Sequence, residues 1–327
     1  MPQGLASVSG DAQSWSLEAL EAAMLPPHAA SKRGHDVIFA WLAKYQEAKA
    51  AGQEAINGTV GSLLENDGTL AVNAVVASTL REQADLELSG YAPLPGLPHF
   101  RSMVKQLALG DGLSVIQQHG IHTDSIITPG GTGALYVSAR NLLAPGSALL
   151  LRDRHWGPYD TIAKECGITT ATWPLMGDGE QIDLAALQSI LGELLTEQDQ
   201  ILSWLNDPAH NPTGMSLTAE SRAIVLDAFA AAATAHPGKG VTLFIDGAYA
   251  AYAREHHGWG ETLASFAKEC IWPANLLVCF GFSASKSHTL YGQRCGALVM
   301  LHPSQPFIDR LHEVMLHSGR GTWSGAA

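Results

Sequence analysis

Between residues 125 and 301, short apolar runs alternate with longer stretches of helical periodicity. An apolar run of four to eight residues bounded by turn residues predicts a buried strand, and the amphipathic stretches between such runs predict helices. Strands are expected at 125–128, 148–151, 169–173, 201–205, 241–245, 276–280 and 295–301, and helices at 134–143, 159–166, 184–195 and 218–235. This alternation predicts βα units, and therefore an α/β domain with a mainly parallel sheet covered by helices on both faces.

Ahead of this block the sequence predicts helices and loops. Four segments are expected, in order: a helical arm at 35–51, an extended piece at 56–64, a rigid proline-spaced loop at 90–98 and a helix at 100–109. The arm is predicted from Val37, Trp41 and Tyr45, which recur on one side of a helix.

Composition and charge argue against several classes of partner. The net charge is -12, with 19 basic against 31 acidic residues and no basic run, which argues against nucleic acid and anionic membranes. No apolar stretch is long enough to span a bilayer, and the N-terminus has no charged segment followed by an apolar one. The four cysteines form no CxxC pair and predict free thiols. These features predict a cytoplasmic protein.

A lysine and an arginine follow the expected strand at 276–280. Lys286 stands in a small-residue loop, where burial lowers the pKa of an amine, and a neutral amine can form a Schiff base with an aldehyde. Ser283 and Arg294 flank it with a hydroxyl and a fixed positive charge, which suit a phosphate monoester. Taken alone, the loop is equally consistent with a surface lysine and a structural arginine.

A glycine-rich turn at 130–133 lies between an expected strand and an expected helix. Backbone N–H groups at a helix N-terminus, together with the Thr132 hydroxyl, can bind an anion. The spacing is neither that of a Walker loop nor the GxGxxG of dinucleotide folds. A plain turn without a ligand remains the alternative.

Three further loops follow expected strands and carry candidate ligand-binding side chains. Trp156 could stack on a flat ring or pack the domain surface. Asn211 lies in a proline-restricted loop and could bind a phenolate-type oxygen or simply form a turn. Asp246 ends a strand, where a carboxylate could keep a pyridine nitrogen protonated or cap a helix, and Tyr249 follows three residues later.

Together these segments resemble one known family. In order they are Gly-Gly-Thr-Gly at 130–133, Trp156, Asn-Pro-Thr-Gly at 211–214, Asp-Gly-Ala-Tyr at 246–249, and Ser-Ala-Ser-Lys at 283–286 with Arg294 eight residues later. The set resembles class I aminotransferases of the aspartate and aromatic branch, which are fold type I enzymes dependent on pyridoxal phosphate, and the likeness runs from about Gly58 to Ser324. It implies a three-layer αβα fold.

The resemblance also implies an activity and roles around the cofactor ring. An amino group would move between an aromatic or dicarboxylic L-amino acid and a 2-oxo acid by a ping-pong cycle. Lys286 would hold pyridoxal phosphate as a Schiff base and then act as general base and acid. Asp246 would pair with the pyridinium nitrogen, while Asn211 and Tyr249 would bind the phenolic oxygen and Trp156 would stack on the ring.

The phosphate and the substrate have their own implied residues. Gly131, Thr132, Ser283 and Arg294 would hold the phosphate, and Tyr91 would reach the phosphate of a neighbouring subunit, which implies a homodimer. Substrate would be bound by four residues: Gly61, which closes over it, Trp156, Asn211, and Arg320, which pairs with the distal carboxylate of a dicarboxylic substrate in the partner's site.

The end of the chain departs from the family pattern. The family continues Ser-Asn-Pro-Pro where this chain reads Ser-Gly-Ala-Ala at 324–327, and then completes a small domain. That domain carries the arginine that binds the substrate α-carboxylate, and no residue here matches it. The expected domains are therefore an N-terminal arm with part of a small domain at 1–60, a large cofactor-binding domain at 61–305, and the start of an incomplete C-terminal small domain at 306–327.

Two other functions stay open at this point. A β-lyase or decarboxylase would use the same fold and cofactor, and a catalytically impaired fragment would bind the cofactor only. No metal is expected, because His312 and His317 lie five residues apart instead of the four that place two ligands on one helix face.

Overall fold

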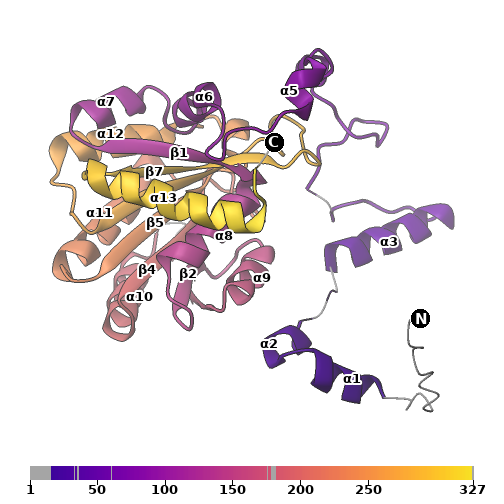
Figure 1. Cartoon of the computed structure of the whole chain (residues 1–327), viewed down its shortest axis with the longest axis horizontal. Coiled ribbons are helices and arrows are strands. Elements are labelled where there is room, and N and C mark those ends of the chain that lie inside the picture. The colour runs from indigo at the N-terminus through magenta and orange to yellow at the C-terminus, as the bar shows by residue number, and fades with distance from the viewer. Residues whose placement is uncertain are drawn as a thin grey trace, which may run out of the picture. The chain divides into compact units, whose positions relative to one another are not determined.

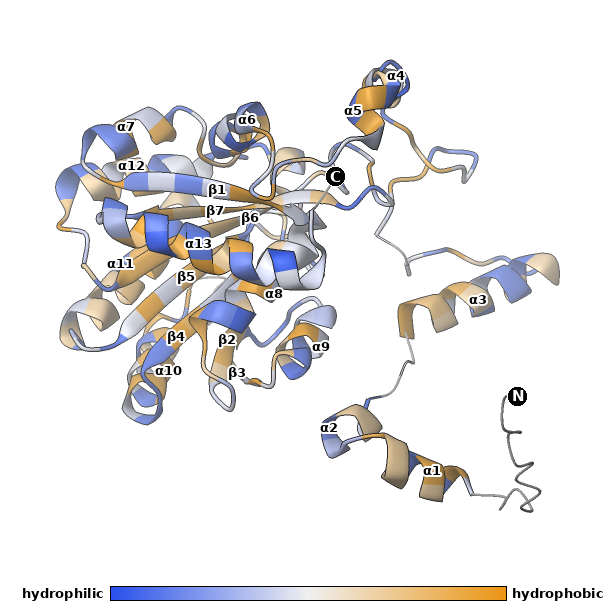
Figure 2. Cartoon of the chain, viewed as in Figure 1, coloured by the Kyte–Doolittle hydropathy of each residue, from blue (hydrophilic) through white to orange (hydrophobic). Residues whose placement is uncertain are grey.

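The computed structural model describes residues 16–32, 34, 37–59, 61–174, 176–177 and 182–325. The chain divides into two compact units, residues 1–61 and 62–327. The first unit contains α1 (Leu17–Met24), α2 (Pro27–Ala30) and α3 (Val37–Ala50). The expected arm at 35–51 is thus confirmed as α3 over its described part, whereas α1 and α2 were not expected. None of the three helices buries a residue, and the large side chains of Met24, Phe39 and Trp41 are exposed. Figure 2 shows hydrophobic residues along α1 and α3.

The second unit is built on a seven-stranded sheet (Figure 1). Its strands are β1 (His122–Pro129), β2 (Ala148–Arg152), β3 (Thr169–Trp173), β4 (Gln200–Asn206), β5 (Gly240–Asp246), β6 (Leu276–Ser283) and β7 (Cys295–His302). The strand order is β1-β7-β6-β5-β4-β2-β3. All seven predicted strands are present, so the predicted α/β class is confirmed.

The pairing of the strands aligns their ends. The pairs β2–β3, β2–β4, β4–β5 and β5–β6 are parallel, and β7 runs antiparallel to both β6 and β1. Asn206 lies opposite Asp246, and Asp246 lies opposite Gly281. Ser283 lies opposite Gly296, near the start of β7. The carboxyl ends of β4, β5 and β6 therefore meet the first residues of β7 at one edge of the sheet.

Helices cover both faces of the sheet and make three layers (Figure 1). One face carries α8 (Gly130–Leu142), α9 (Pro158–Glu165) and α13 (Gln305–Thr322). The other carries α6 (Pro98–Leu109), α7 (Gly112–Gln118), α10 (Leu184–Glu197), α11 (Ala219–Ala235) and α12 (Gly258–Glu269). The remaining short helices are α4 (Ala74–Arg81), α5 (Asp85–Ser89) and the 3-10 turn η2 (Ala250–Tyr252).

The alternation of side chains along each strand supplies two hydrophobic cores. In β5, Leu243 and Ile245 pack toward α10, α11 and α12, whereas Phe244 packs toward α8 and α9. Successive strand residues point to opposite faces, so a strand buried on both sides is apolar throughout. Each of these side chains is at most 1 % exposed, and burying one contributes about 1.5–3 kcal/mol.

Side-chain caps at the helix N-termini determine which backbone N–H groups remain available to a ligand. The side chains of Asp183, Thr218 and Ser304 cap α10, α11 and α13 by accepting backbone N–H groups. By contrast, α8 begins at Gly130 directly after β1 and has no side-chain cap. Its first N–H groups are therefore available to a ligand at the same edge of the sheet.

Some local expectations were wrong or incomplete. The extended piece expected at 56–64 forms no strand in its described part, which contains only an isolated bridge between Leu64 and Leu70, and Val60 lies outside the described residues. The helix expected at 134–143 begins four residues earlier, inside the glycine turn. Helices α7 and α12 were not anticipated. Within the described part of the chain, no helix is long and apolar enough to cross a membrane.

Candidate active site

A pocket of about 220 Å³ opens at the edge where the strand ends meet. Nine of the residues that the sequence nominates line it: Gly131, Thr132, Trp156, Asn211, Asp246, Tyr249, Ser283, Lys286 and Arg294. Four others that were not nominated complete the lining: Asn206, Ala248, Ser285 and Tyr291. The structure thus brings side chains from five separate loops to one place.

The glycine turn allows β7 and its preceding loop to approach the start of α8. Gly130 has φ +71°, and a Cβ there would lie 2.8 Å from Nη2 of Arg294. A Cβ on Gly131 would lie 3.3 Å from the Cβ of Ser283, which is tighter than ordinary van der Waals contact. Glycine at these two positions therefore lets the N-terminus of α8 stand directly against a serine and an arginine.

Arg294 joins the two sides of this corner. Its Nη2 donates to Oγ1 of Thr132 at 3.3 Å, and its Nη1 donates to Oγ of Ser285 at 3.3 Å and to the carbonyl of Tyr291 at 3.1 Å. Its backbone adopts φ +56°, an unusual conformation for a residue with a side chain. The guanidinium, three hydroxyls including that of Ser283, and the uncapped α8 terminus form a cup whose chemistry suits a phosphate.

Asp246 is buried at the end of β5 and is held by two donors. The Tyr159 hydroxyl donates to Oδ2 at 2.5 Å, and the Ala248 N–H donates to Oδ1 at 3.0 Å. Burial raises the pKa of this carboxyl above its ordinary value, while both hydrogen bonds and the positive charge of Lys286 act in the opposite direction. A buried carboxylate held in this way can pair with a protonated ring nitrogen.

Tyr159 is a site residue that the sequence analysis missed. It lies in the first turn of α9, and its ring makes edge-on contacts with Trp156 at 5.7 Å and Trp204 at 5.1 Å between centroids. Burial raises the pKa of its phenol well above the ordinary value, and the negative charge of Asp246 adds to this. The phenol therefore stays protonated and donates. The only sequence signal is its position three residues after Trp156.

Lys286 presents its amine beside two aromatic rings. Nζ lies 5.3 Å from the ring centroid of Tyr249 and 5.6 Å from that of Tyr291. Burial lowers the pKa of this amine, the positive charge of Arg294 lowers it further, and Asp246 acts in the opposite direction. The Tyr252 hydroxyl donates to the Lys286 carbonyl at 2.7 Å and holds the backbone. The amine is thus easier to deprotonate than an exposed lysine.

The loop after β4 brings Asn211 to Tyr249. The Asn211 amide donates to the Tyr249 hydroxyl at 3.4 Å, and burial raises the pKa of that phenol. Asn206 sets the loop, because its Oδ1 accepts the Asn211 N–H at 2.6 Å and its Nδ2 donates to the Asp246 carbonyl at 2.8 Å. The amide and the phenol therefore face the pocket as a pair of hydrogen-bonding groups.

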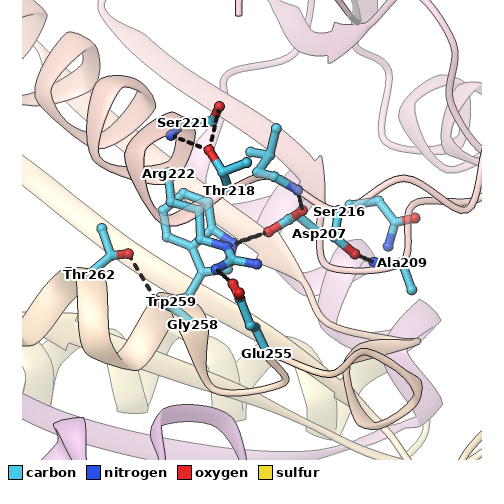
Figure 3. A network of polar contacts seen from close by, with 12 residues as sticks. Asp207, Ala209, Ser216, Thr218, Ser221, Arg222, Glu255, Gly258, Trp259 and Thr262 are labelled. Carbon is cyan, nitrogen blue, oxygen red and sulfur yellow. Dashed lines mark hydrogen bonds and ion pairs between the residues drawn. The ribbon is translucent and has the colours of Figure 1, made fainter. Parts of the chain in front are cut away.

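A buried ionic network supports this loop from behind (Figure 3). Oδ2 of Asp207 accepts from Nε of Arg222 at 3.0 Å and from the Trp259 indole at 2.7 Å, and Oδ1 accepts the Leu217 N–H at 2.7 Å. Nη1 of Arg222 also reaches the exposed Glu255 at 3.2 Å. The network ties the segment after β4 to α11 and α12.

Three nominated residues are not part of this pocket lining. Tyr91 is fully exposed in the loop before α6. Arg320 lies on α13, where its Nη1 donates to Oγ of Ser324 at 2.8 Å. Gly61 is the last residue of the first unit. The roles given to these three residues stay predictions.

A larger cavity, about 970 Å³, lies at the opposite edge of the sheet, where Val241, Leu277 and Phe307 line it. Size does not identify the site here. The smaller pocket gathers a buried carboxylate, an amine with a lowered pKa and a phosphate-like cup, and such convergent groups mark a candidate active site.

Comparisons with known proteins place the chain among aminotransferases. The aromatic-amino-acid aminotransferase of Escherichia coli (strain K12) is 27% identical over 270 residues, which cover 81% of this chain and 64% of that protein. The aspartate aminotransferase of Salmonella typhi is 27% identical over 240 residues, which cover 72% of this chain and 56% of that protein. The chain therefore spans less than two thirds of the length of these two relatives.

A solved structure and a family model agree with these relatives. The aminotransferase of Anaerococcus prevotii matches with a TM-score of 0.84 at 29% identity, covering 93% of this chain and 72% of that chain. The family model for aminotransferase class I and II matches residues 54–318, which is most of the chain. This chain belongs to the aminotransferase class I and II family.

Proposed function

We propose that this chain is a pyridoxal-phosphate-dependent aminotransferase that moves an amino group between an aromatic or dicarboxylic L-amino acid and a 2-oxo acid by a ping-pong cycle. The observation that carries the proposal is the shared pocket of Lys286 and Asp246, an amine with a lowered pKa and a buried carboxylate. Family membership and the aromatic and aspartate relatives support the choice of reaction and of substrate class.

The residues present fit pyridoxal phosphate. The cup formed by Thr132, Ser283, Ser285 and Arg294 at the start of α8 would hold the phosphate. Trp156 would cover the ring, as Tyr159 already fixes its indole from the edge. When bound, the cofactor supplies an electron-withdrawing ring that stabilises negative charge at the substrate α-carbon.

The chain's own groups would perform the acid–base work. The lowered pKa of Lys286 leaves its amine able to hold the cofactor aldehyde and to move a proton at the substrate α-carbon. Asp246, with Tyr159 behind it, would keep the ring nitrogen protonated. Asn211 and Tyr249 would hydrogen-bond the phenolic oxygen and hold the ring in register with the amine.

Substrate recognition and assembly are part of the same proposal. Arg320 would pair with the distal carboxylate of a dicarboxylic substrate in the partner's site, and Gly61 would close over the substrate. Tyr91 is fully exposed and would reach the phosphate of a neighbouring subunit, which is consistent with a cytoplasmic homodimer with shared active sites. The enzyme would act in amino acid metabolism.

Absorbance spectroscopy tests the proposal. Purified protein mixed with pyridoxal phosphate should develop the visible band of lysine-bound cofactor, and Lys286→Ala should abolish it. Lys268→Ala is the matched control, since Lys268 is exposed on α12 and away from the pocket. Addition of aspartate or phenylalanine alone should convert the cofactor to its pyridoxamine form. Release of ammonia and pyruvate from a β-substituted amino acid such as serine, without that conversion, would instead identify a β-lyase.

A further inference from the structure

A second cavity of about 190 Å³ lies behind the candidate active site. Asn206 lines both cavities. The lining of the second cavity runs from the end of β2 to the first turn of α11: Arg152, Met176, Asn206, Asp207, His210, Met215, Ser216, Leu217, Thr218 and Ser221. Nothing in the proposed reaction uses this space.

Arg152 lines this cavity with an incompletely satisfied guanidinium. The residue is 3 % exposed, and its Nε has no hydrogen-bond partner. Its other side-chain contacts are to uncharged groups: Nη2 lies 3.8 Å from Sδ of Met176, and the guanidinium lies 4.4 Å from the ring centroid of Trp173. Burial lowers the pKa of Arg152 to about 10, which still leaves it charged at neutral pH. The carboxylates of Asp207 and Asp153 act on this charge electrostatically, but they leave its Nε–H without an acceptor, and a buried donor without an acceptor is costly.

The carboxylate of Asp207, which also lines this cavity, already accepts hydrogen bonds from other groups. Both of its carboxylate oxygens accept hydrogen bonds, from Arg222, Trp259 and the Leu217 N–H. Among the ion pairs of the described residues, none includes Arg152. Asp207 therefore lies close enough to Arg152 to act on it electrostatically without neutralising it by contact.

The opposite wall offers hydroxyl donors and a helix terminus. Ser216, Thr218 and Ser221 line it at the start of α11, a helix of 17 residues whose dipole favours negative charge at this end. The Ser216 oxygen accepts the Ala209 N–H at 2.9 Å, so its own proton can be donated elsewhere. Burial, and then Arg152, lower the pKa of His210 to about 4, so this imidazole adds no charge at neutral pH.

We propose that this cavity binds a small oxyanion of the size of inorganic phosphate between Arg152 and the hydroxyls of Ser216 and Ser221 at the start of α11. A cavity of about 190 Å³ has room for an anion of the size of phosphate or sulfate. The bound anion accepts the Nε–H of Arg152, which has no acceptor in the protein. It also braces the segment 206–218, which carries Asn211 into the active site.

The test must separate this site from the phosphate cup of the active site. The full chain carrying Arg294→Gln, which weakens that cup, is the background. Inorganic phosphate and sulfate are titrated against sodium chloride of equal ionic strength, with binding read by calorimetry and by the rise in Tm. In this background we expect a phosphate-dependent rise in Tm. Addition of Arg152→Gln should weaken binding at least about tenfold, as expected for the loss of a charge-assisted hydrogen bond.

Two further variants keep the test decisive. Arg154→Gln removes the same charge from an exposed neighbour that does not line the cavity, and it should leave phosphate affinity unchanged. If Arg152→Gln fails to fold, the pair Ser216→Ala and Ser221→Ala takes its place and should also weaken binding. Equal phosphate affinity with and without these substitutions, or no effect of phosphate beyond that of chloride, would overturn the proposal. Cofactor binding is read separately by absorbance, so failure here leaves the proposed function untouched.

Discussion

The Tyr159 hydroxyl donates to Oδ2 of Asp246 at 2.5 Å, inside a shell that leaves Tyr159 only 1 % exposed. Tyr159→Phe removes this donor and keeps the ring contacts with Trp156 and Trp204. Because the hydrogen bond lowers the carboxyl pKa, its loss should raise the pKa of Asp246 further and move the acid limb of kcat to higher pH. A stability loss of about 1–3 kcal/mol is also expected from one unsatisfied buried oxygen.

The matched control for this variant is Tyr136→Phe, on α8 and outside the pocket lining. It should change neither the pH profile nor the spectrum of bound cofactor. A purely structural role of Tyr159 predicts lower stability with an unshifted pH profile, and that result would contradict a role of its hydroxyl in tuning Asp246.

The strands show how far the sequence alone could predict the fold. The run 241–245 is apolar at every position except Thr242, and β5 is indeed buried on both faces from Val241 to Asp246. A local pattern carries no information on strand direction, so the antiparallel insertion of β7 between β1 and β6 could not be predicted. Likewise α12 was not anticipated, since it begins with Gly258, Trp259 and Gly260, and glycines weaken a helix prediction. In the structure the two glycines let the start of α12 lie against Arg222 and Leu109.

The residues of the candidate active site also fall into those that could be predicted from the sequence and those that could not. Residues next to strand ends, such as Asp246 and Ser283, could be nominated because the ends of parallel strands meet at one edge. Tyr159, Asn206 and Ser285 were missed, since each acts through a partner that is distant in sequence or through a single local contact. A tyrosine in the first turn of a helix has an ordinary structural explanation until the structure places its hydroxyl against a carboxylate.

Arg294→Gln should separate recognition of the phosphate from recognition of the ring. The guanidinium bonds Thr132 and Ser285 and stands beside the α8 terminus, so its loss removes charge only from the cup. A charge-assisted hydrogen bond contributes about 1.5–3 kcal/mol, which corresponds to roughly a tenfold to hundredfold loss of affinity for pyridoxal phosphate. Equilibrium titration followed by absorbance measures it. Pyridoxal, which has no phosphate, should bind the variant and the unaltered chain alike, and a parallel loss for both would refute the cup.

The lowered pKa of Lys286 has a consequence for stability as well as for chemistry. In the folded chain the amine loses its proton below the ordinary pKa of 10.5, so the unfolded chain binds more protons between the two values. Charged Lys286 therefore destabilises the fold at pH 7, and the penalty fades as the pH rises toward 10.5. Lys286→Met should be more stable than the unaltered chain at neutral pH, with the difference shrinking as the pH rises and vanishing only above pH 10.5 in urea unfolding without cofactor. Lys268→Met should give no such pH-dependent difference.

In the ionic network behind the loop, Arg222 pairs with two carboxylates whose contributions to stability can be compared. Arg222 is 1 % exposed and contacts the buried Asp207 and the exposed Glu255. Asp207→Asn should cost about 3–5 kcal/mol of unfolding free energy, because it leaves a buried guanidinium without its main counter-charge. Glu255→Gln should cost less than about 1 kcal/mol, because Glu255 is exposed and water screens its charge, while Arg222 keeps Asp207. Combining Asp207→Asn with Arg222→Met should restore part of the loss in a double-mutant cycle by urea unfolding, whereas strictly additive losses would show that the two side chains are not coupled.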